Sequence, residues 1–274
     1  MIHTVLIHAR KQARWLTRAI VGVLATAFFL FLGIPLAALL LREPPALLWQ
    51  DLQQPGVLQA LQLSVLTTCA STLLAILLGI PVAYVLTRTR IPGRRFLEIL
   101  VTMPTILPPV VAGVALLITF GRLGLVGRLL APFGITLSFT TVAVVLAQLF
   151  VASPFFVNSV KAGLEQLDSR YEQAAYTLRA SPFYTFRRVT LPLIRPALLS
   201  GIGTSWARAL GEFGATIMFA GNFPGTTQTM PLAIYIAAQT DLDTTVALSV
   251  LLMAVSFGIL LALNLGRGKR ERSG

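Results

Sequence analysis

The sequence of 274 residues is short of charge: only 12% of its residues are Asp, Glu, Lys or Arg, whereas 55% are hydrophobic. A chain of this composition has too few polar side chains to cover the surface of a water-soluble globule of its length. The shortage argues against the soluble classes and predicts a protein of the lipid bilayer.

Groups that carry chemistry are equally scarce. Cys69 is the single cysteine and the two histidines are His3 and His8, so an intrachain disulfide is excluded and a metal site is not expected. The chain has no phosphate-binding loop of the G-x-x-x-x-G-K-[ST] kind. We therefore predict no catalytic residue, no metal and no cofactor bound by this chain, and a membrane enzyme is disfavoured.

The sequence is rich in long apolar runs, and about 20 such residues are needed to cross a hydrocarbon core. The runs lack the period-2 alternation of membrane strands. We predict an all-α membrane protein with six transmembrane helices near Ala19–Leu41, Ala60–Leu86, Phe96–Phe120, Phe139–Val160, Ala197–Ala220 and Thr244–Leu265. The first is taken as a retained helix because it is too long for a signal-peptide core. Kinks are expected at Pro35, Pro81, Pro104, Pro108 and Pro109.

Basic residues alternate in number from loop to loop. If the N-terminus is cytoplasmic, then all of the 22 Lys and Arg residues lie in cytoplasmic segments except Arg42, Arg122, Arg128 and Arg208. The positive-inside rule therefore predicts that both termini are cytoplasmic. The domains are a basic N-terminus at 1–18, one transmembrane domain at 19–265 with an insert at 161–196, and a basic tail at 266–274. Topology and anionic lipid headgroups account for the net charge of +12, so no nucleic-acid partner is predicted.

The insert between the fourth and fifth spans contains the long polar stretch YEQAAYTLRASPFYTFRRVTLPLIRP, Tyr171 to Pro196. One helical face is predicted from Leu164 to Leu178, made of Leu164, Leu167, Tyr171, Ala174, Ala175 and Leu178. Asp168 or Ser169 is a candidate cap for this helix. Ser181 and Pro182 are typical of a second helix start, and Leu191-Pro192 is expected to end or bend that helix. On these residues alone the helix-turn-helix is either an interfacial element or a docking element for a cytoplasmic partner.

The insert resembles the coupling loop of ABC importer permeases, whose consensus is E-A-A, three residues, Gly, nine residues and I-x-L-P. AA at 174–175 and VTLP at 189–192 match it with the spacing kept. Gln173 stands in place of the consensus glutamate, with Glu172 one residue earlier, and Arg179 stands in place of the glycine. The resemblance implies an ATPase-coupling surface made of Tyr171, Glu172, Gln173, Ala174, Ala175, Leu178, Arg179, Leu191 and Pro192.

Two further segments are similar to molybdate-type permeases: MPTILPPVVAG at 103–113 and ARALGEFGATIMFAGNFPGTTQTMPLAIY at 207–235. Sulfate-type relatives share the layout but usually differ within GEFGAT and AGN. The resemblance implies a multi-pass permease of the bacterial inner membrane that imports molybdate or tungstate by alternating access. The alternatives are a sulfate or thiosulfate permease, and an ion-coupled secondary transporter, which is expected to have two related halves that are not evident here.

The same resemblance implies partners. They are a second copy of this chain, two ABC ATPase subunits that use ATP and Mg, an extracytoplasmic oxyanion-binding protein and the lipid membrane. The loop at 221–231 is either a contact for that binding protein or only a connection between helices.

Charges within the predicted fifth span are a further candidate site. Arg208 and Glu212 are spaced for one helical face, and charges at this depth are costly unless paired. Candidates for the translocation path or gate are Arg208, Gly211, Glu212, Gly214 and Thr216. Anion contacts are expected from Thr204, Ser205, Thr216, Arg208 or backbone N–H groups. The competing interpretation of Arg208 and Glu212 is a structural ion pair.

Overall fold

The computed structural model describes residues 2–42 and 54–271. The chain divides into two compact units, residues 1–50 and residues 51–274. The first unit contains helix α1 (Ile2–Arg42), which includes the predicted first span and continues through Pro35. Residues Thr17–Arg42 are long and apolar enough to cross a membrane, and the most apolar part of them is entirely unburied. A hydrophobic helix of this length is suited to a lipid environment.

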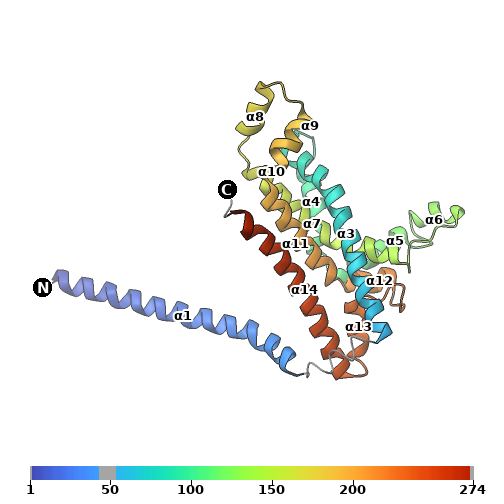
Figure 1. The fold of residues 1–274 in the computed structure, drawn as a ribbon, viewed down its shortest axis with the longest axis horizontal. Coiled ribbons are helices and arrows are strands. Elements are labelled where there is room, and N and C mark those ends of the chain that lie inside the picture. Colours follow the sequence, from blue (N-terminus) through green and yellow to red (C-terminus); the bar gives the residue numbers. More distant parts are fainter. Residues whose placement is uncertain (1, 43–53, 272–274) are drawn as a thin grey trace. The chain divides into compact units, whose positions relative to one another are not determined.

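The second unit is a bundle of helices (Figure 1). Its long helices are α3 (Pro55–Arg88), α7 (Thr141–Gln166), α11 (Arg195–Leu210) and α14 (Leu242–Glu271). The shorter ones are α4 (Arg94–Ile106), α5 (Pro109–Phe120), α6 (Gly127–Leu130), η1 (Ala131–Phe133), α8 (Arg170–Thr177), α9 (Pro182–Thr185), η2 (Phe186–Thr190), α10 (Leu191–Leu193), α12 (Gly214–Ala220) and α13 (Met230–Ala237). The residues that the structure describes form no strand, so the predicted all-α class is confirmed for them.

Helix α7 lies at the centre of the bundle and packs against α3, α4, α5, α11 and α12. Small residues on the neighbouring helices permit this close approach. A Cβ added to Gly79 of α3 would lie 2.7 Å from the Phe156 ring, and one added to Gly201 of α11 would lie 3.1 Å from the same ring. Phe156 is fully buried between them. Helices in lipid gain stability from such tight contacts because lipid tails compete for apolar surface.

Not every predicted span is a single helix of sufficient length. Among the described residues, four helices are long and apolar enough to cross a membrane, or five if one bent pair counts as a span. They correspond to the first, second, fourth and sixth predicted spans, of which the fourth was placed two residues too early at its start, and the bent pair corresponds to the third. The predicted fifth span, Ala197–Ala220, was wrong as a continuous helix: it consists of α11, which has 16 residues, and α12, which has 7.

The predicted third span is bent by 117° between α4 and α5. Leu107 and Pro108 have extended backbone, with ψ of 135° and 134°. The residue before a proline is disfavoured in the helical region, and Pro108 and Pro109 supply no N–H to the helix. The expected irregularity at these prolines is confirmed as a full break. In contrast, Pro35, Pro81 and Pro104 lie within continuous helices.

The two broken spans pack against each other at their breaks. A Cβ added to Gly214, the first residue of α12, would lie 2.8 Å from Cβ of Pro109, the first residue of α5. A Cβ added to Gly113 of α5 would lie 2.8 Å from the carbonyl oxygen of Ala215. Neither position has room for a side chain, so the two glycines set the distance between α5 and α12.

Helix α3 presents a stripe of hydroxyl side chains to the interior. Ser64, Thr67, Thr68, Ser71 and Thr72 are all buried, and their spacing of three and one places them on one helical face. Ser64 Oγ accepts a hydrogen bond from the Met230 amide of α13 at 2.7 Å. Gln148 Nε2 of α7 donates to Thr68 Oγ1 at 3.5 Å. The stripe connects α3 to its neighbours through polar contacts within an otherwise apolar bundle.

The insert does not begin with the continuous helix predicted from Leu164. Helix α7 ends at Gln166, and Leu167 has extended backbone with ψ of 120°. Asp168 Oδ1 accepts a hydrogen bond from the Arg170 amide at 2.9 Å, which starts α8 as a separate helix. Leu164 and Leu167 therefore pack with the bundle core and do not share a face with α8. Of the two candidate caps, Ser169 stands at the N-cap position without a side-chain bond, and Asp168 supplies the bond one residue earlier.

The end of α8 is closed by a turn at Arg179. Its φ of 58° is left-handed, which glycine adopts more readily. The Arg179 amide donates to the Tyr176 carbonyl at 2.9 Å, and the Ala180 amide donates to the Ala175 carbonyl at 3.1 Å. This pair of bonds is a Schellman motif. The turn implied by the consensus glycine therefore exists with arginine in its place.

The second helix of the insert runs from Pro182 to Leu193 as α9, a π-helical turn η2 and α10. Ser181 Oγ accepts a hydrogen bond from the Tyr184 amide at 3.3 Å, which confirms the predicted cap. The helix continues through Leu191-Pro192 and bends at Ile194, whose ψ of 7° departs from the helical value. The predicted bend at Leu191-Pro192 therefore lies two residues later.

We expect Gly113→Ala to lower the unfolding temperature of the purified protein by several degrees. The added methyl group would meet backbone atoms of α12, which cannot rotate away, and overpacking of this kind costs about 1–3 kcal/mol. Thermal unfolding in detergent measures the change. Gly258→Ala is the matched control, because an added Cβ there meets nothing within 4 Å. An equal effect of both substitutions would contradict the packing argument.

We expect Arg179→Gly to stabilise the turn after α8 by about 1 kcal/mol, because glycine adopts a left-handed conformation without the steric cost of Cβ. Hydrogen exchange of the amides at 178–181 should become slower. Ala180→Gly is the control: its φ is not positive, so there the added backbone freedom should give no stabilisation. Faster exchange in Arg179→Gly would refute the assignment.

Candidate functional site

Helix α8 has its apolar and acidic residues on unexpected sides. The side chains of Tyr171 and Leu178 face outward, with the residues 56% and 84% exposed, whereas Glu172 is only 8% exposed. Ala174 is also exposed and lies between Tyr171 and Leu178 on the same outward face. A helix that merely covers a core turns its apolar face inward. The inversion on α8 therefore indicates a surface for binding another molecule.

The other predicted coupling residues lie around this surface. Gln173 and Arg179 are exposed, and Ala175 is half-buried. Pro192 is exposed, whereas Leu191 is half-buried against the bundle core. The structure thus brings Tyr171, Ala174 and Leu178 together as an outward patch, and it uses Leu191 to anchor the insert.

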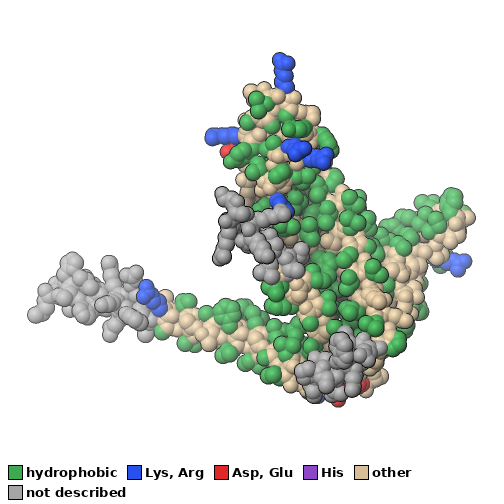
Figure 2. Space-filling model, in the orientation of Figure 1, with side chains coloured by type: hydrophobic (Ala, Val, Ile, Leu, Met, Phe, Trp, Pro, Cys, Tyr) green, Lys and Arg blue, Asp and Glu red, His purple; other side chains and the backbone are tan. Residues whose placement is uncertain are grey.

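Basic side chains gather at the same end of the bundle. Figure 2 shows Lys and Arg around α8 and α9. Below them, four charges link α4 to α7. Lys161 Nζ lies 2.9 Å and Arg94 Nε lies 3.0 Å from the same Glu98 oxygen, and Glu165 lies within 3.8 Å of both cations. The charge of Glu98 is thus compensated at the α4–α7 contact.

Glu172 is bound from two sides. Arg88 Nε lies 3.1 Å from Glu172 Oε2, and Thr190 Oγ1 donates to Oε1 at 2.8 Å. The contact with Arg88 is a close ion pair without an aligned Nε–H hydrogen bond. Sequence reasoning did not find Arg88 or Thr190. Arg88 lies 84 positions and Thr190 lies 18 positions from Glu172 in the sequence, and the fold alone brings them together. No local pattern marks such a contact.

Arg208 and Glu212 form the predicted pair across the end of α11. Arg208 Nη2 lies 2.7 Å from Glu212 Oε2, and Glu212 is 1% exposed. The other carboxylate oxygen accepts a hydrogen bond from the Ala215 amide of α12 at 2.8 Å. The carboxylate therefore joins the last turn of α11 to the first turn of α12 across the break. This geometry gives Glu212 a structural role at the helix irregularity where it was expected.

The remaining path candidates differ in exposure. Gly211 is exposed at the break, whereas Gly214 and Thr216 are buried. Thr216 Oγ1 has no hydrogen-bond partner among the described residues. Thr204 is exposed, and its hydroxyl donates to carbonyls of its own helix. Ser205 is buried and donates to the Ala152 carbonyl at 3.0 Å, so its proton is already used in helix packing.

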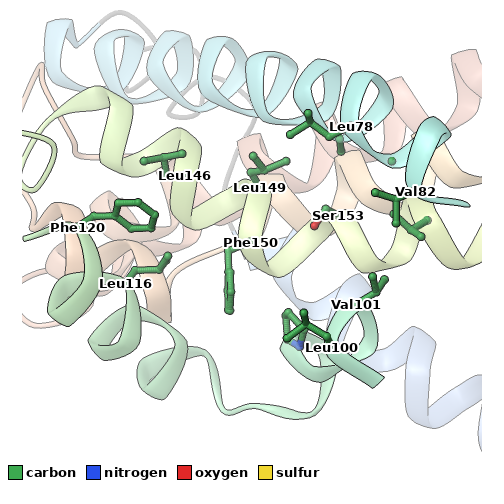
Figure 3. A pocket seen from close by; sticks show the side chains of 14 residues that line it. Leu78, Val82, Leu100, Val101, Leu116, Phe120, Leu146, Leu149, Phe150 and Ser153 are labelled. Carbon is green, nitrogen blue, oxygen red and sulfur yellow. The ribbon is translucent and has the colours of Figure 1, made fainter. Parts of the chain in front are cut away.

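A cavity of about 370 Å³ lies where α4 and α5 diverge, against α3 and α7. Figure 3 shows Phe150 of α7 pointing into the space between the two helices. Ser153 is the single polar side chain in a lining otherwise made of apolar residues and Gly79. An oxyanion requires several donors or cations, so this cavity is unsuited to it.

The loop at 221–229 is tied to the bundle. Thr227 Oγ1 accepts from the Phe223 amide at 2.9 Å, and the Thr226 carbonyl accepts from Thr141 Oγ1 at 2.9 Å. Thr227 and Thr229 are buried, whereas Phe223 is 51% exposed. The threonines of this loop therefore mainly hold the chain between α12 and α13 in place, and Phe223 remains exposed to solvent or lipid.

Beyond the loop, Asp241 caps the start of α14. The Thr244 hydroxyl, with the amides of Asp243 and Thr244, holds the pKa of Asp241 below its ordinary value. The carboxylate is thus kept in the charged form that a helix N-terminus favours.

Comparison with known proteins places this geometry in a family. The family model of the binding-protein-dependent transport system inner membrane component matches residues 72–265. The molybdenum transport system permease protein ModB of Mycobacterium bovis is 47% identical over 232 residues, which are 85% of this chain and 88% of that protein. The sulfate transport system permease protein CysT of Escherichia coli is 35% identical over 239 residues, 86% of each chain.

A solved structure supports the fold. A bacterial ABC transporter involved in the import of the acidic polysaccharide alginate superposes with a TM-score of 0.75, at 16% identity, over 93% of this chain and 96% of that chain. The match in family, the identity to ModB over most of the chain and the several membrane-length helices agree with one another. This chain therefore belongs to the binding-protein-dependent transport system inner membrane components and is a multi-pass protein of the inner membrane.

Proposed function

We propose that the chain is the permease subunit of an ATP-driven importer that moves molybdate into the cytoplasm. The observation that carries the proposal is the outward apolar face of α8, which offers a partner a stiff helical knob of Tyr171, Ala174 and Leu178. A separate ABC ATPase docks there, and it binds and hydrolyses ATP with its own Mg. The permease itself supplies no ATPase chemistry and holds no cofactor.

The proposed topology has six spans, with the third and fifth broken. Both termini and the insert face the cytoplasm, which places the basic residues around α8 on the cytoplasmic side. Two copies of the chain surround the path, each with one ATPase, and an extracytoplasmic binding protein delivers the anion. The breaks at 107–108 and 211–213 are where such helices line a path, because irregular backbone in a membrane is tolerated where it faces protein or water.

Molybdate is favoured over sulfate by the degree of identity. Permeases named for molybdenum reach 47% identity, whereas those named for sulfate reach 36%. Both anions are tetrahedral dianions, so the discrimination belongs mainly to the binding protein. Radiolabelled molybdate uptake in proteoliposomes, with sulfate in excess, tests the choice. Equal inhibition by excess sulfate would favour a sulfate permease, and uptake without an ATPase would favour a secondary transporter.

Ala174→Asp should abolish most of the ATP hydrolysis that the loaded binding protein stimulates. The new carboxylate would be buried unpaired beneath the ATPase, and loss of about 1.4 kcal/mol of docking energy already weakens binding about tenfold. ATP hydrolysis in proteoliposomes measures the effect, and Ala174→Asp with Ala175→Asp extends it.

The matched control for the docking test is Ala131→Asp, an exposed alanine on η1 directly after α6, which lies well away from α8 (Figure 1). It should hydrolyse ATP as the parent does. If Ala174→Asp also behaves as the parent, α8 is not the docking helix.

Substitution of Glu212 separates a gate from a purely structural pair. Glu212→Gln keeps an acceptor for the Ala215 amide but leaves Arg208 without its counter-charge. If the break is part of the gate, uptake should fall while the unfolding temperature changes little. Glu212→Ala also removes the acceptor for the Ala215 amide and should lower stability by about 1–3 kcal/mol more than Glu212→Gln does. Normal uptake and normal ATP hydrolysis in Glu212→Gln would leave the pair with a structural role alone.

A further inference from the structure

The inward side of α8 holds a charge where a packing helix usually places an apolar residue. Glu172 precedes by two positions the exposed Ala174 of the proposed docking surface. Its carboxylate is turned to the bundle, and its side chain is 11% exposed. A carboxylate withdrawn from water in this way must find its partners within the protein.

The partners of Glu172 come from two other elements. Arg88, in the last turn of α3, lies 3.1 Å away, and Thr190, in the π-helical turn η2, donates at 2.8 Å. Thr190 is 1% exposed and the Arg88 side chain is 18% exposed. Arg88 Nη2 also lies 3.4 Å from the Leu167 carbonyl, within the extended segment between α7 and α8. We call Arg88, Glu172 and Thr190 the clasp.

Aromatic contacts surround the clasp. Tyr84, one turn before Arg88 on α3, packs edge-on against Phe186 of η2 with ring centroids 5.3 Å apart. The end of α3 therefore contacts both helices of the insert through neighbouring residues on one side. Because these contacts join the insert to the end of α3, a displacement of the insert would also move that end of α3.

We propose that the clasp makes α3 move with α8, so that Arg88, Glu172 and Thr190 are positioning residues for the coupling of ATP hydrolysis to transport. The inference rests on the proposed function, in which α8 docks the ATPase. The outward face of α8 binds the partner, and the inward carboxylate carries the resulting movement to a helix that spans the membrane.

The chemistry of the Arg88–Glu172 contact suits a role in carrying movement from α8 to α3 better than a role in stabilising the fold alone. A buried ion pair contributes little net stability compared with apolar packing, but it specifies one arrangement, and removal of one partner is strongly unfavourable. The carboxylate has two oxygens committed to two different elements, which fixes its direction. Slippage of α8 along α3 would break the contact with Arg88, and displacement of α8 from η2 would break the contact with Thr190.

The test separates docking from transmission. Glu172→Gln and Thr190→Val are placed in the full permease, reconstituted with its ATPase and binding protein. Retention of the ATPase on immobilised permease reports docking, and molybdate imported per ATP hydrolysed reports transmission. ATPase retention should match the parent, because the outward face is unchanged. Molybdate imported per ATP should fall by about fivefold or more in Glu172→Gln, the lower end of typical coupling between sites.

Glu165→Gln is the matched control, because it removes a carboxylate near the end of α7 that precedes α8. The Glu165 side chain is 49% exposed, and its ion pairs with Lys161 and Arg94 are 3.7 and 3.8 Å long. It should import molybdate with the parental yield per ATP. The exchanged pair Arg88→Glu with Glu172→Arg should recover part of the yield lost by either substitution alone, as interacting neighbours do. A contact that only stabilises the fold would change the unfolding temperature and not the yield per ATP.

Two results would overturn the proposal. One is a parental yield per ATP in both Glu172→Gln and Thr190→Val; if Glu172→Gln does not fold, Thr190→Val decides alone, because it removes the donor and keeps the side-chain shape. The other is loss of ATPase retention in these variants, which would make the clasp part of docking. Failure of the parent itself to retain an ATPase would instead contradict the proposed function.

Discussion

A glycine and a proline meet where two membrane segments are broken: Cβ of Pro109 lies so near to Gly214 that a side chain at the glycine would overlap it. In hydrocarbon, a break in a helix leaves backbone groups that water cannot satisfy. The bundle places the break before α5 beside the break before α12, and Glu212 supplies an acceptor for the amide of Ala215. Glu212 and Gly214 at the second break are thereby buried in protein, whereas Pro108 and Gly211 stay exposed. The packing of α5 against α12 depends on this contact.

The insert follows a different constraint, because it lies outside the predicted spans. Helix α8 keeps a carboxylate inside and apolar side chains outside. The inward charge is compensated by Arg88 and Thr190, and the outward residues stay uncovered. A surface of this kind is costly in an isolated protein and useful in an assembly, so the inversion links the local fold to partnership with another subunit.

Sequence reasoning predicted correctly those features that depend on residues close together in the chain. Apolar run length placed four spans within single helices, and Pro108 with Pro109 marked the break between α4 and α5. The hydroxyl stripe of α3 could also have been predicted, because its residues are spaced for one helical face: Ser64, Thr67, Thr68, Ser71 and Thr72. It was overlooked because those residues lie within an apolar run. The continuous helix from Leu164 to Leu178 was wrong, because helical spacing alone does not register the separate start that Asp168 provides.

The sequence by itself determined the membrane class, the all-α fold, the insert with its two helices and the pairing of Arg208 with Glu212, because hydropathy, helix caps and four-residue spacing are local properties. Only the tertiary structure decided which side of α8 faces out, that α5 and α12 meet at Gly113 and Gly214, and that Glu172 binds Arg88. These facts depend on contacts between residues far apart in the chain. Packing distance and charge compensation select such contacts only after the helices have assembled.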